Sequence, residues 1–249
     1  MHPSEVFVDA VVLHSRPYQE DSALCELFTA QYGRVAGVVK KVRGPKSTKK
    51  SLIQPFQGIS VKWCGRGELK SFTQLEAQPE LSVFLQGKAA LCGLYINELM
   101  VRLLTHFDPY PKLFGHYVRC LFELKDADNV ELPLRVFENA LLQALGYAPD
   151  WSCHSHTGAP LVASEWYLFD PLQGIIDAPS SPGSSVDLAL PPEVTGRSEA
   201  GQFMGASLIA VAAGDYSEQG TLRDAKRLMR MALGAQLGDK PLLSRMLFV

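Results

Sequence analysis

Long apolar runs are absent from this sequence. No stretch of about 18 uninterrupted apolar residues occurs, the length that a helix needs to cross a bilayer. The first twenty residues carry acidic and polar side chains where a secretory signal would need an apolar core. We therefore expect a cytosolic protein without membrane-spanning segments. Hydrophobic residues make up 47% of the chain, which is enough for folded domains.

Cysteine is also scarce. The five cysteines are odd in number and spread over different segments, whereas secreted disulfide frameworks use even numbers at close spacings. We therefore expect reduced thiols, most of them packed inside the protein. They are Cys25, Cys64, Cys92, Cys120 and Cys153.

The common motifs of catalysis are missing. No G-x-S-x-G or H-E-x-x-H pattern occurs. The segment 44–48 is not an ATP-binding loop, because Pro45 separates Gly44 from Lys46 and Val39 stands where the first glycine would be. The sequence predicts no active site, and we expect a protein that is not an enzyme.

A short Cys/His cluster, Cys153-His154-Ser155-His156, is the best candidate for a metal site. A structural zinc ion needs four ligands, commonly in two pairs, and no Cys or His follows His156. We expect a polar loop, with no zinc and no other cofactor. A metal-dependent hydrolase at this cluster stays an alternative, and it predicts stoichiometric bound metal.

Charge is distributed unevenly, although the net charge is only −2. Residues 34–70 hold ten Lys and Arg against one acid, Glu68, whereas residues 121–200 hold three against twelve. Attraction to phosphate acts over about 8 to 10 Å at physiological salt, so a polyanion would bind the first region and avoid the second. This asymmetry favours a nucleic-acid-binding function.

The first part of the chain predicts an all-β domain. Five short segments read as strands, at 6–13, 22–28, 34–40, 56–64 and 69–76. The fourth is the clearest, because Ile59, Val61 and Trp63 alternate with polar residues. Turns are expected at 16–18, 31–33 and 65–67, and a long basic connection at 41–51. Five strands without interleaved helices indicate a small closed barrel of the OB type.

The period of the hydrophobic pattern changes after residue 80. Helices are expected at 81–106 and 112–125, and from Pro133 to Gly146. Residues 151–196 are rich in Pro, Gly, Ser and Asp and show one strand, at 165–169. Helices at 198–213 and 221–237 follow, the latter opened by a Thr221-x-x-Asp224 cap. The predicted fold is α+β and multidomain, with a barrel at 1–79, a helical bundle at 80–150 and 197–249, and an irregular insertion at 151–196.

Two basic elements are candidates for binding phosphate. Each Lys or Arg that neutralises a phosphate releases counterions, so the basic run 34–70 predicts affinity that does not depend on base sequence. The last long helix places four cations on one face, although a solvated face is an equal interpretation. Aromatic residues on which bases could stack, or which could be core, are Tyr18, Tyr32, Phe56, Trp63 and Phe72.

Many short stretches, in order along nearly the whole chain, are similar to one family. They are 13–18 (LHSRPY), 27–29 (LFT), 33–35 (GRV), 54–56 (QPF), 65–69 (GRGEL), 95–99 (YINEL), 134–138 (LRVFE), 145–147 (LGY), 226–230 (KRLMR) and 240–245 (KPLLSR). Together they resemble the RecO family of bacterial DNA repair proteins.

The resemblance implies an OB barrel, a helical bundle and an embedded zinc-ribbon-like subdomain. It also implies binding of single- and double-stranded DNA, annealing of complementary strands, and partnership with RecR and single-stranded-DNA-binding protein during RecA loading. Family members with zinc use two Cys pairs in the insertion, whereas this chain has only Cys153 there. The insertion is therefore expected to be a degenerate ribbon without zinc.

These arguments assign candidate site residues. Phosphate contacts are expected at Arg34, Lys40, Lys41, Arg43, Lys46, Lys49, Lys50, Arg66 and Lys70, with a secondary strip at Arg223, Lys226, Arg227 and Arg230. The acidic tail of single-stranded-DNA-binding protein, which in the family ends in an aromatic residue, needs an apolar slot beside a cation. Tyr117, Leu121, Arg135 and Phe137 are candidates for that slot, or else they are core. An OB-type RNA-binding adaptor stays an alternative function, and it predicts that RNA competes at least as well as DNA.

Overall fold

The computed structural model describes residues 6–42, 47–178 and 201–248. The chain forms two compact units. The barrel unit comprises Met1–Ala140 and Asp239–Val249, and the sheet unit comprises Leu141–Gly238. The predicted division at 79, 150 and 196 follows local composition and stays a prediction. None of the described helices is long and apolar enough to span a membrane.

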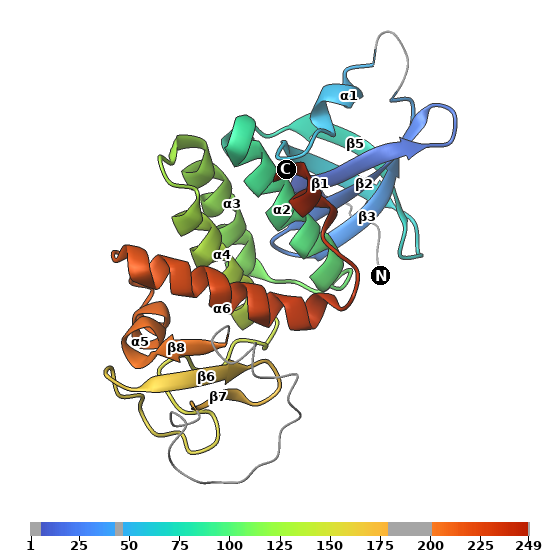
Figure 1. The fold of residues 1–249 in the computed structure, drawn as a ribbon. Helices are drawn as coiled ribbons and strands as arrows, with labels where there is room; N and C mark the ends of the chain where they lie inside the picture. Colours follow the sequence, from blue (N-terminus) through green and yellow to red (C-terminus); the bar gives the residue numbers. More distant parts are fainter. Residues whose placement is uncertain (1–5, 43–46, 179–200, 249) are drawn as a thin grey trace. The chain divides into compact units, whose positions relative to one another are not determined.

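Five strands close the barrel in the order β1-β2-β3-β5-β4 (Figure 1). The pairing is antiparallel throughout, except that β3 and β5 are parallel. The strands are β1 (Val8–Tyr18), β2 (Ser22–Thr29), β3 (Gly33–Val39), β4 (Gly58–Cys64) and β5 (Lys70–Ala77). The five-stranded OB-like barrel that the sequence predicts is therefore confirmed.

One expected turn is part of a strand. β1 continues through 16–18, where Pro17 pairs with Ala23 and Tyr18 with Ser22, and the reversal follows at 19–21. The physical reason is that β4 pairs with β1 only from Val8 to Val11. Pro17 therefore lies where β1 has no strand on its second side, and its missing N–H costs no hydrogen bond to such a strand. The hairpin therefore reaches beyond the closed part of the barrel.

The barrel interior is filled by aliphatic side chains and two aromatic rings. Trp63 and Phe72 contact each other edge to face, with ring centroids 6.4 Å apart. Gly33 begins β3 with φ of 64°, and a side chain there would collide with the carbonyl oxygen of Asp108. The buried cluster extends to Val42 and Ile53, which close the barrel on the side of the long connection.

Helices of the barrel unit follow the strands. They are α1 (Lys49–Leu52), η1 (Pro79–Leu81), α2 (Gly87–Leu103), α3 (Pro111–Asp126), α4 (Glu131–Ala144, which ends in the sheet unit) and η3 (Leu243–Phe248). The buried Asn97 amide of α2 donates to the carbonyl oxygen of Leu13 in β1 at 2.8 Å and accepts from the Tyr117 hydroxyl of α3 at 2.7 Å. This chain of bonds fixes α2 and α3 against the barrel.

The sheet unit holds three antiparallel strands and two helices. β6 (Trp166–Asp170) lies between β7 (Gly174–Asp177) and β8 (Gln202–Met204), followed by α5 (Gly205–Ala213) and α6 (Gln219–Leu237). The segment expected to be irregular thus contains a hairpin, because Tyr167, Phe169 and Ile175 supply a buried face. α6 begins two residues before the predicted cap, and Thr221 is buried in its first turn.

Candidate nucleic-acid interface

Four lysines gather where β3 ends and α1 begins. Lys40 and Lys41 follow β3 and are exposed, and α1 contributes Lys49 and the exposed Lys50. The Lys49 ammonium donates to the carbonyl oxygen of Lys40 at 3.1 Å, which brings the two pairs together. We call these four residues the lysine cluster. Three of its members, Lys40, Lys41 and Lys50, are exposed.

Backbone geometry holds the lysine cluster in place. Lys41 has φ of 60°, which bends the chain directly after β3, and Ser47 donates from Oγ to the Lys41 carbonyl oxygen at 2.9 Å. The amide of Val42 donates to the Asp21 carbonyl oxygen at 2.7 Å, so the end of β3 is tied to the β1–β2 hairpin. The long connection expected at 41–51 is therefore anchored at both ends, and it contains α1 where no helix was expected.

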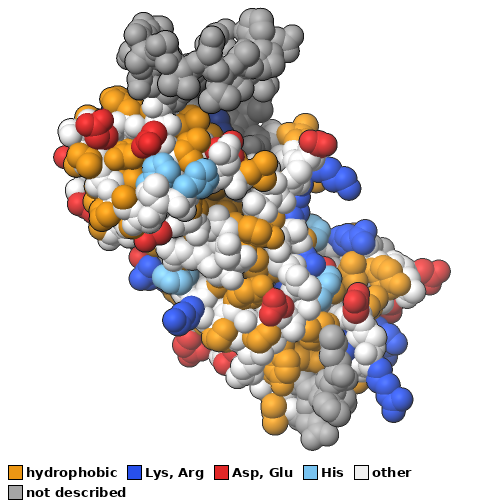
Figure 2. Space-filling model, turned by 90° about the horizontal axis from the view of Figure 1, so that it is seen from below, with side chains coloured by type: hydrophobic (Ala, Val, Ile, Leu, Met, Phe, Trp, Pro, Cys, Tyr) orange, Lys and Arg blue, Asp and Glu red, His pale blue; other side chains and the backbone are white. Residues whose placement is uncertain are grey.

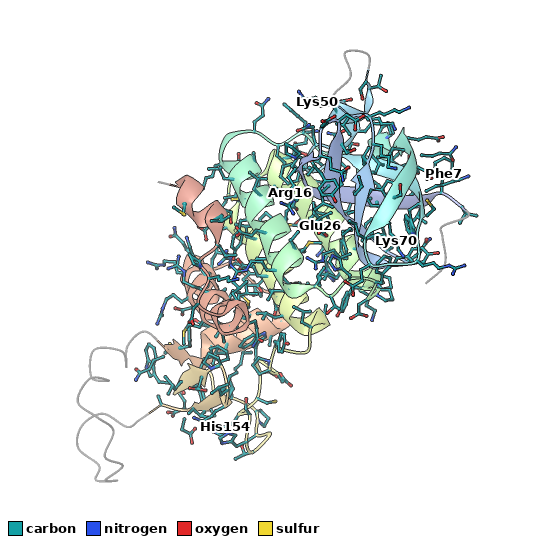
Figure 3. All side chains as sticks on the ribbon, turned by 90° about the vertical axis from the view of Figure 1, so that its right-hand side faces the viewer. Phe7, Arg16, Glu26, Lys50, Lys70 and His154 are labelled. Carbon is teal, nitrogen blue, oxygen red and sulfur yellow. The ribbon has the colours of Figure 1, made fainter. Side chains whose placement is uncertain are left out.

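A groove of about 740 Å³ lies beside the lysine cluster. Its lining includes Arg16 and Pro17 of the β1–β2 hairpin, and Lys50 and Gln54 from α1 and the residues after it. In Figure 3 Lys50 lies at the α1 end of the barrel, away from Lys70. Sequence reasoning missed Arg16 because the segment was interpreted as a turn, although Arg-Pro-Tyr was among the stretches that carry the family resemblance.

Arg34 is not available to phosphate, which corrects its assignment as a contact. Its side chain is only 12% exposed, and its guanidinium donates to the Val101 carbonyl oxygen and lies 3.9 Å from the Glu26 carboxylate. Burial lowers its pKa below the ordinary value, and the negative charge of Glu26 acts in the opposite direction. Arg34 therefore holds the start of β3 to the end of α2.

Lys70 is also not available to phosphate, which corrects its assignment as a contact. Its side chain is buried, its ammonium donates to the Gly65 carbonyl oxygen at 3.0 Å, and the same nitrogen lies 4.7 Å from the centre of the Phe107 ring. Arg66 is exposed on the β4–β5 turn, apart from the lysine cluster. Arg43 and Lys46 lie outside the described residues.

Most of the candidate aromatic residues belong to the core. Phe56, Trp63 and Phe72 are buried, so they offer no platform for a base. Tyr18 and Tyr32 are about one-third exposed. Tyr18 ends β1 next to the groove, whereas the Tyr32 ring contacts Trp63 edge to face at 5.2 Å.

The α6 strip is only partly open. Arg223, Lys226 and Arg230 are exposed. Arg227 instead pairs with Asp224 at 3.0 Å and lies 4.8 Å from the Phe203 ring centre, so part of its charge serves the fold. Figure 2 shows one face of the molecule, on which Lys and Arg side chains lie singly among acidic and hydrophobic ones rather than in one patch.

The expected slot for an acidic tail is not a surface feature, which is a further correction. Tyr117, Leu121 and Phe137 are fully buried, and Arg135 is 5% exposed. Arg135 instead pairs with Glu138 at 3.0 Å, and Glu138 also accepts a hydrogen bond from Tyr95 at 2.7 Å. Burial raises the pKa of Tyr117 well above its ordinary value, as expected of a core phenol. These residues are the core of the helical part.

The Cys/His cluster forms a loop held by its own hydrogen bonds. His154 accepts the amides of His156 and Thr157 at Nδ1, at 3.3 and 3.4 Å, and its Nε2 lies 3.8 Å from Asp177. Three or more His, Cys, Asp or Glu side chains placed to hold a metal ion are not found among residues 6–42, 47–178 and 201–248. The five cysteines are free, and Cys25, Cys92 and Cys120 are buried, as the sequence predicts.

The fold places this chain in the class of proteins in which an OB-like barrel is followed by helices. Family models described as Recombination protein O N terminal and Recombination protein O C terminal match residues 1–78 and 85–246. The chain therefore belongs to the RecO family of DNA repair proteins.

Curated relatives agree with this assignment. The chain is similar to the DNA repair protein RecO of Glaesserella parasuis, with 39% identity over 95% of this chain and 92% of the relative. The protein of the same description from Cellvibrio japonicus is 39% identical over 96% and 94% of the two chains. That from Coxiella burnetii is 37% identical over 95% and 94%.

Proposed function

We propose that this protein is a recombination mediator that binds single- and double-stranded DNA and anneals complementary strands. The observation that carries the proposal is the lysine cluster, with Arg16 beside it, at one end of an OB-like barrel. Several cations within a short stretch of surface can neutralise neighbouring phosphates of a strand and release counterions. Family membership supports the same function.

Annealing follows from electrostatics without a chemical step. Two strands repel each other through their phosphates, and bound cations lower that repulsion. Contacts to phosphate leave the base edges free, so the complement can pair with a bound strand. The protein would make and break no covalent bond, in agreement with the absence of catalytic motifs from the sequence.

The family suggests the partners. We propose that the protein works with RecR to load RecA on DNA coated by single-stranded-DNA-binding protein, in the bacterial cytoplasm and without a cofactor. The tail of single-stranded-DNA-binding protein would need a site other than the buried Tyr117 and Phe137. The exposed Arg223, Lys226 and Arg230 of α6 are a second candidate surface for phosphate.

One titration tests binding and annealing together. A fluorescent single strand is titrated with protein at several salt concentrations, and its complement is then added in the same cell. We expect affinity to fall linearly with the logarithm of salt concentration, and pairing to be faster than without protein. Affinity that does not depend on salt, or pairing that is not accelerated, would contradict the proposal. RNA of equal length that competes as well as DNA would favour an RNA-binding adaptor instead.

A further inference from the structure

The sheet unit contains an acidic pocket formed by β8, α5 and the beginning of α6. The pocket has a volume of about 290 Å³, and its lining includes Asp215, Glu218 and Asp224. Among the described residues, no Lys or Arg lines it. The surrounding sequence is acidic as well, because residues 136–222 hold ten Asp and Glu against one Arg. The negative potential of such a region attracts cations and repels nucleic acid.

The fold neutralises only part of this charge. Asp224 pairs with Arg227 at 3.0 Å. Asp215 accepts the amide of Ser217 at 3.0 Å, and hydrogen bonds from Ser217 hold its pKa below the ordinary value, so it is ionised at neutral pH. Glu218 stands just before α6, but its side chain makes no capping hydrogen bond to the helix. The N-terminus of α6 adds about half a positive charge, so the pocket stays negative.

A buried hydroxyl also belongs to the pocket lining. Thr221 lies in the first turn of α6, is only 6% exposed and lines the pocket. Its hydroxyl makes no hydrogen bond within the part of the chain that the structure describes. Because buried hydroxyls ordinarily have a partner, the Thr221 oxygen is placed to accept from a donor that enters the pocket.

The donor set suits an extended cation. Among the residues that the structure describes, three carboxylates do not come close enough together to hold one metal ion. A guanidinium is larger, and its five N–H donors lie in one plane and can reach separate oxygen atoms. Ligand cavities typically span about 300 to 1,000 Å³, so this pocket has room for a side chain but not for a nucleotide.

Exposed apolar side chains continue from the pocket onto the sheet. Met204 lines the pocket and is 39% exposed. The register of β6 and β8 places it directly opposite Trp166, which is 55% exposed. Directly opposed residues share one face of a sheet and contact each other. Such a surface suits the aliphatic stem of an arginine and the apolar residues next to it in a peptide.

We propose that this acidic pocket binds an arginine side chain from a basic segment of a partner protein. The guanidinium lies among Asp215, Glu218 and the Thr221 hydroxyl, and neighbouring apolar residues of the partner lie over Met204 and Trp166. The inference goes beyond the proposed function, because a pocket that repels phosphate serves a protein and not DNA. The sheet unit thereby gains a protein-binding surface of its own.

Two labelled peptides test the choice of ligand. The probe is Gly-Ser-Leu-Leu-Arg-Leu-Leu-Ser-Gly with a rhodamine label, and its control carries citrulline, a neutral isostere, in place of arginine. Full-length protein is titrated into each peptide at low salt, and fluorescence anisotropy gives the affinity. We expect the arginine peptide to bind at least about tenfold more tightly than the citrulline peptide, because hydrogen bonds between charged groups are lost with the charge. Equal affinities, or no binding of the arginine peptide, would overturn the proposal.

Matched variants test the place of binding. Glu218→Gln removes a charge from the pocket, and Glu165→Gln removes one from an exposed residue of the same unit that does not line it. We expect about tenfold weaker binding of the arginine peptide for Glu218→Gln and less than about twofold for Glu165→Gln. Wild-type affinity in Glu218→Gln, or an equal loss in both variants, would contradict a site in this pocket.

Thr221→Val separates a binding role from a structural one. Valine has nearly the shape of threonine, and the Thr221 hydroxyl has no partner in the described fold, so the melting temperature should not fall. The affinity for the arginine peptide should fall about fivefold, because the guanidinium loses one acceptor. A lower melting temperature with unchanged peptide affinity would show that the hydroxyl serves the fold, and would remove it from the site.

Discussion

The basic run 34–70 contains cations in two different surroundings. Lys41 and Lys50 stand exposed near α1, whereas Arg34 and Lys70 are enclosed at the junction of the barrel with the end of α2. The exposed pair is free to meet phosphate, but the enclosed pair already bonds to carbonyl oxygens, a carboxylate and an aromatic ring. The comparison teaches that a count of cations in a sequence overstates the cationic surface that meets solvent.

A buried ion pair in the helices shows the same difference between charge in the sequence and charge at the surface. Arg135 and Glu138 form an ion pair whose side chains are 6% and 1% exposed. A buried pair adds little net stability, because each charge gives up water, but removal of one partner leaves the other charge buried alone. Such buried residues have a structural role, even where the same side-chain types on a surface would suit a ligand.

The largest effect is expected from Arg135→Met. The substitution leaves the Glu138 carboxylate without its cation and should lower the free energy of unfolding by about 3 to 5 kcal/mol, measured by urea denaturation. Arg135→Met with Glu138→Leu removes both charges and should recover most of the loss. A single variant as stable as wild type would show that Arg135 is open to solvent, and would restore it as a candidate for binding an acidic tail.

A matched pair of variants within the basic run, Arg34→Gln and Lys41→Gln, should give a smaller effect and distinguish enclosed from exposed cations. Arg34→Gln should lower the free energy of unfolding by about 2 kcal/mol, because the Val101 carbonyl loses a charged donor and the Glu26 carboxylate loses a neighbouring cation. The folded variant should keep its salt dependence of binding to single strands. Lys41→Gln should leave stability within about 0.5 kcal/mol and reduce the salt slope by about 0.7. The interpretation fails if Arg34→Gln changes the slope and Lys41→Gln does not.

The smallest effect concerns the C-terminal segment. Glu98 on α2 accepts the amides of Leu243 and Ser244 at 2.8 Å. Burial alone would raise the pKa of Glu98, but hydrogen bonds from Ser244 and Leu243 lower it below the ordinary value. A carboxylate with a lowered folded pKa stabilises the protein above its unfolded pKa of about 4.3, and this contribution is lost as pH falls through the folded value.

Glu98→Gln should therefore reduce stability by about 1 kcal/mol at neutral pH and by less as pH falls below about 4. Thermal melting of wild type and variant between pH 3 and 7 measures the difference. A difference that is constant over this range would mean that the charge of Glu98 does not hold the C-terminal segment.

Much of the barrel could be predicted from sequence because its signals are local. The alternation around Val61 and the spacing of turns indicated the strands to within a few residues. The errors arose where pairing overrode local signals. Pro17 looked like a turn but continues β1, and residues 174–177 had no strand signal of their own but pair with β6.

The candidate site was predicted less well, because it depends on which face each side chain takes after folding. Lys40, Lys41, Lys49 and Lys50 were proposed from charge alone, and in the structure Lys49 bonds to the Lys40 carbonyl oxygen. Arg34 and Lys70 carry the same charge, but they are drawn inward by partners distant in the chain, Val101 and Phe107. Arg16 gave no signal in the charge count, because it lies outside the run 34–70 and lines the same groove as Lys50 only in the folded chain.

The sequence by itself determined the five-stranded barrel, the helices that follow it, the uneven distribution of charge along the chain and the family. Periodicity, composition and similarity are properties of the chain alone. Only the tertiary structure decided which cations meet solvent, that the slot expected for an acidic tail is core, and that Arg16 and Lys50 line one groove. Burial and the approach of distant segments cannot be read from one strand or helix, because they arise when the elements pack against each other.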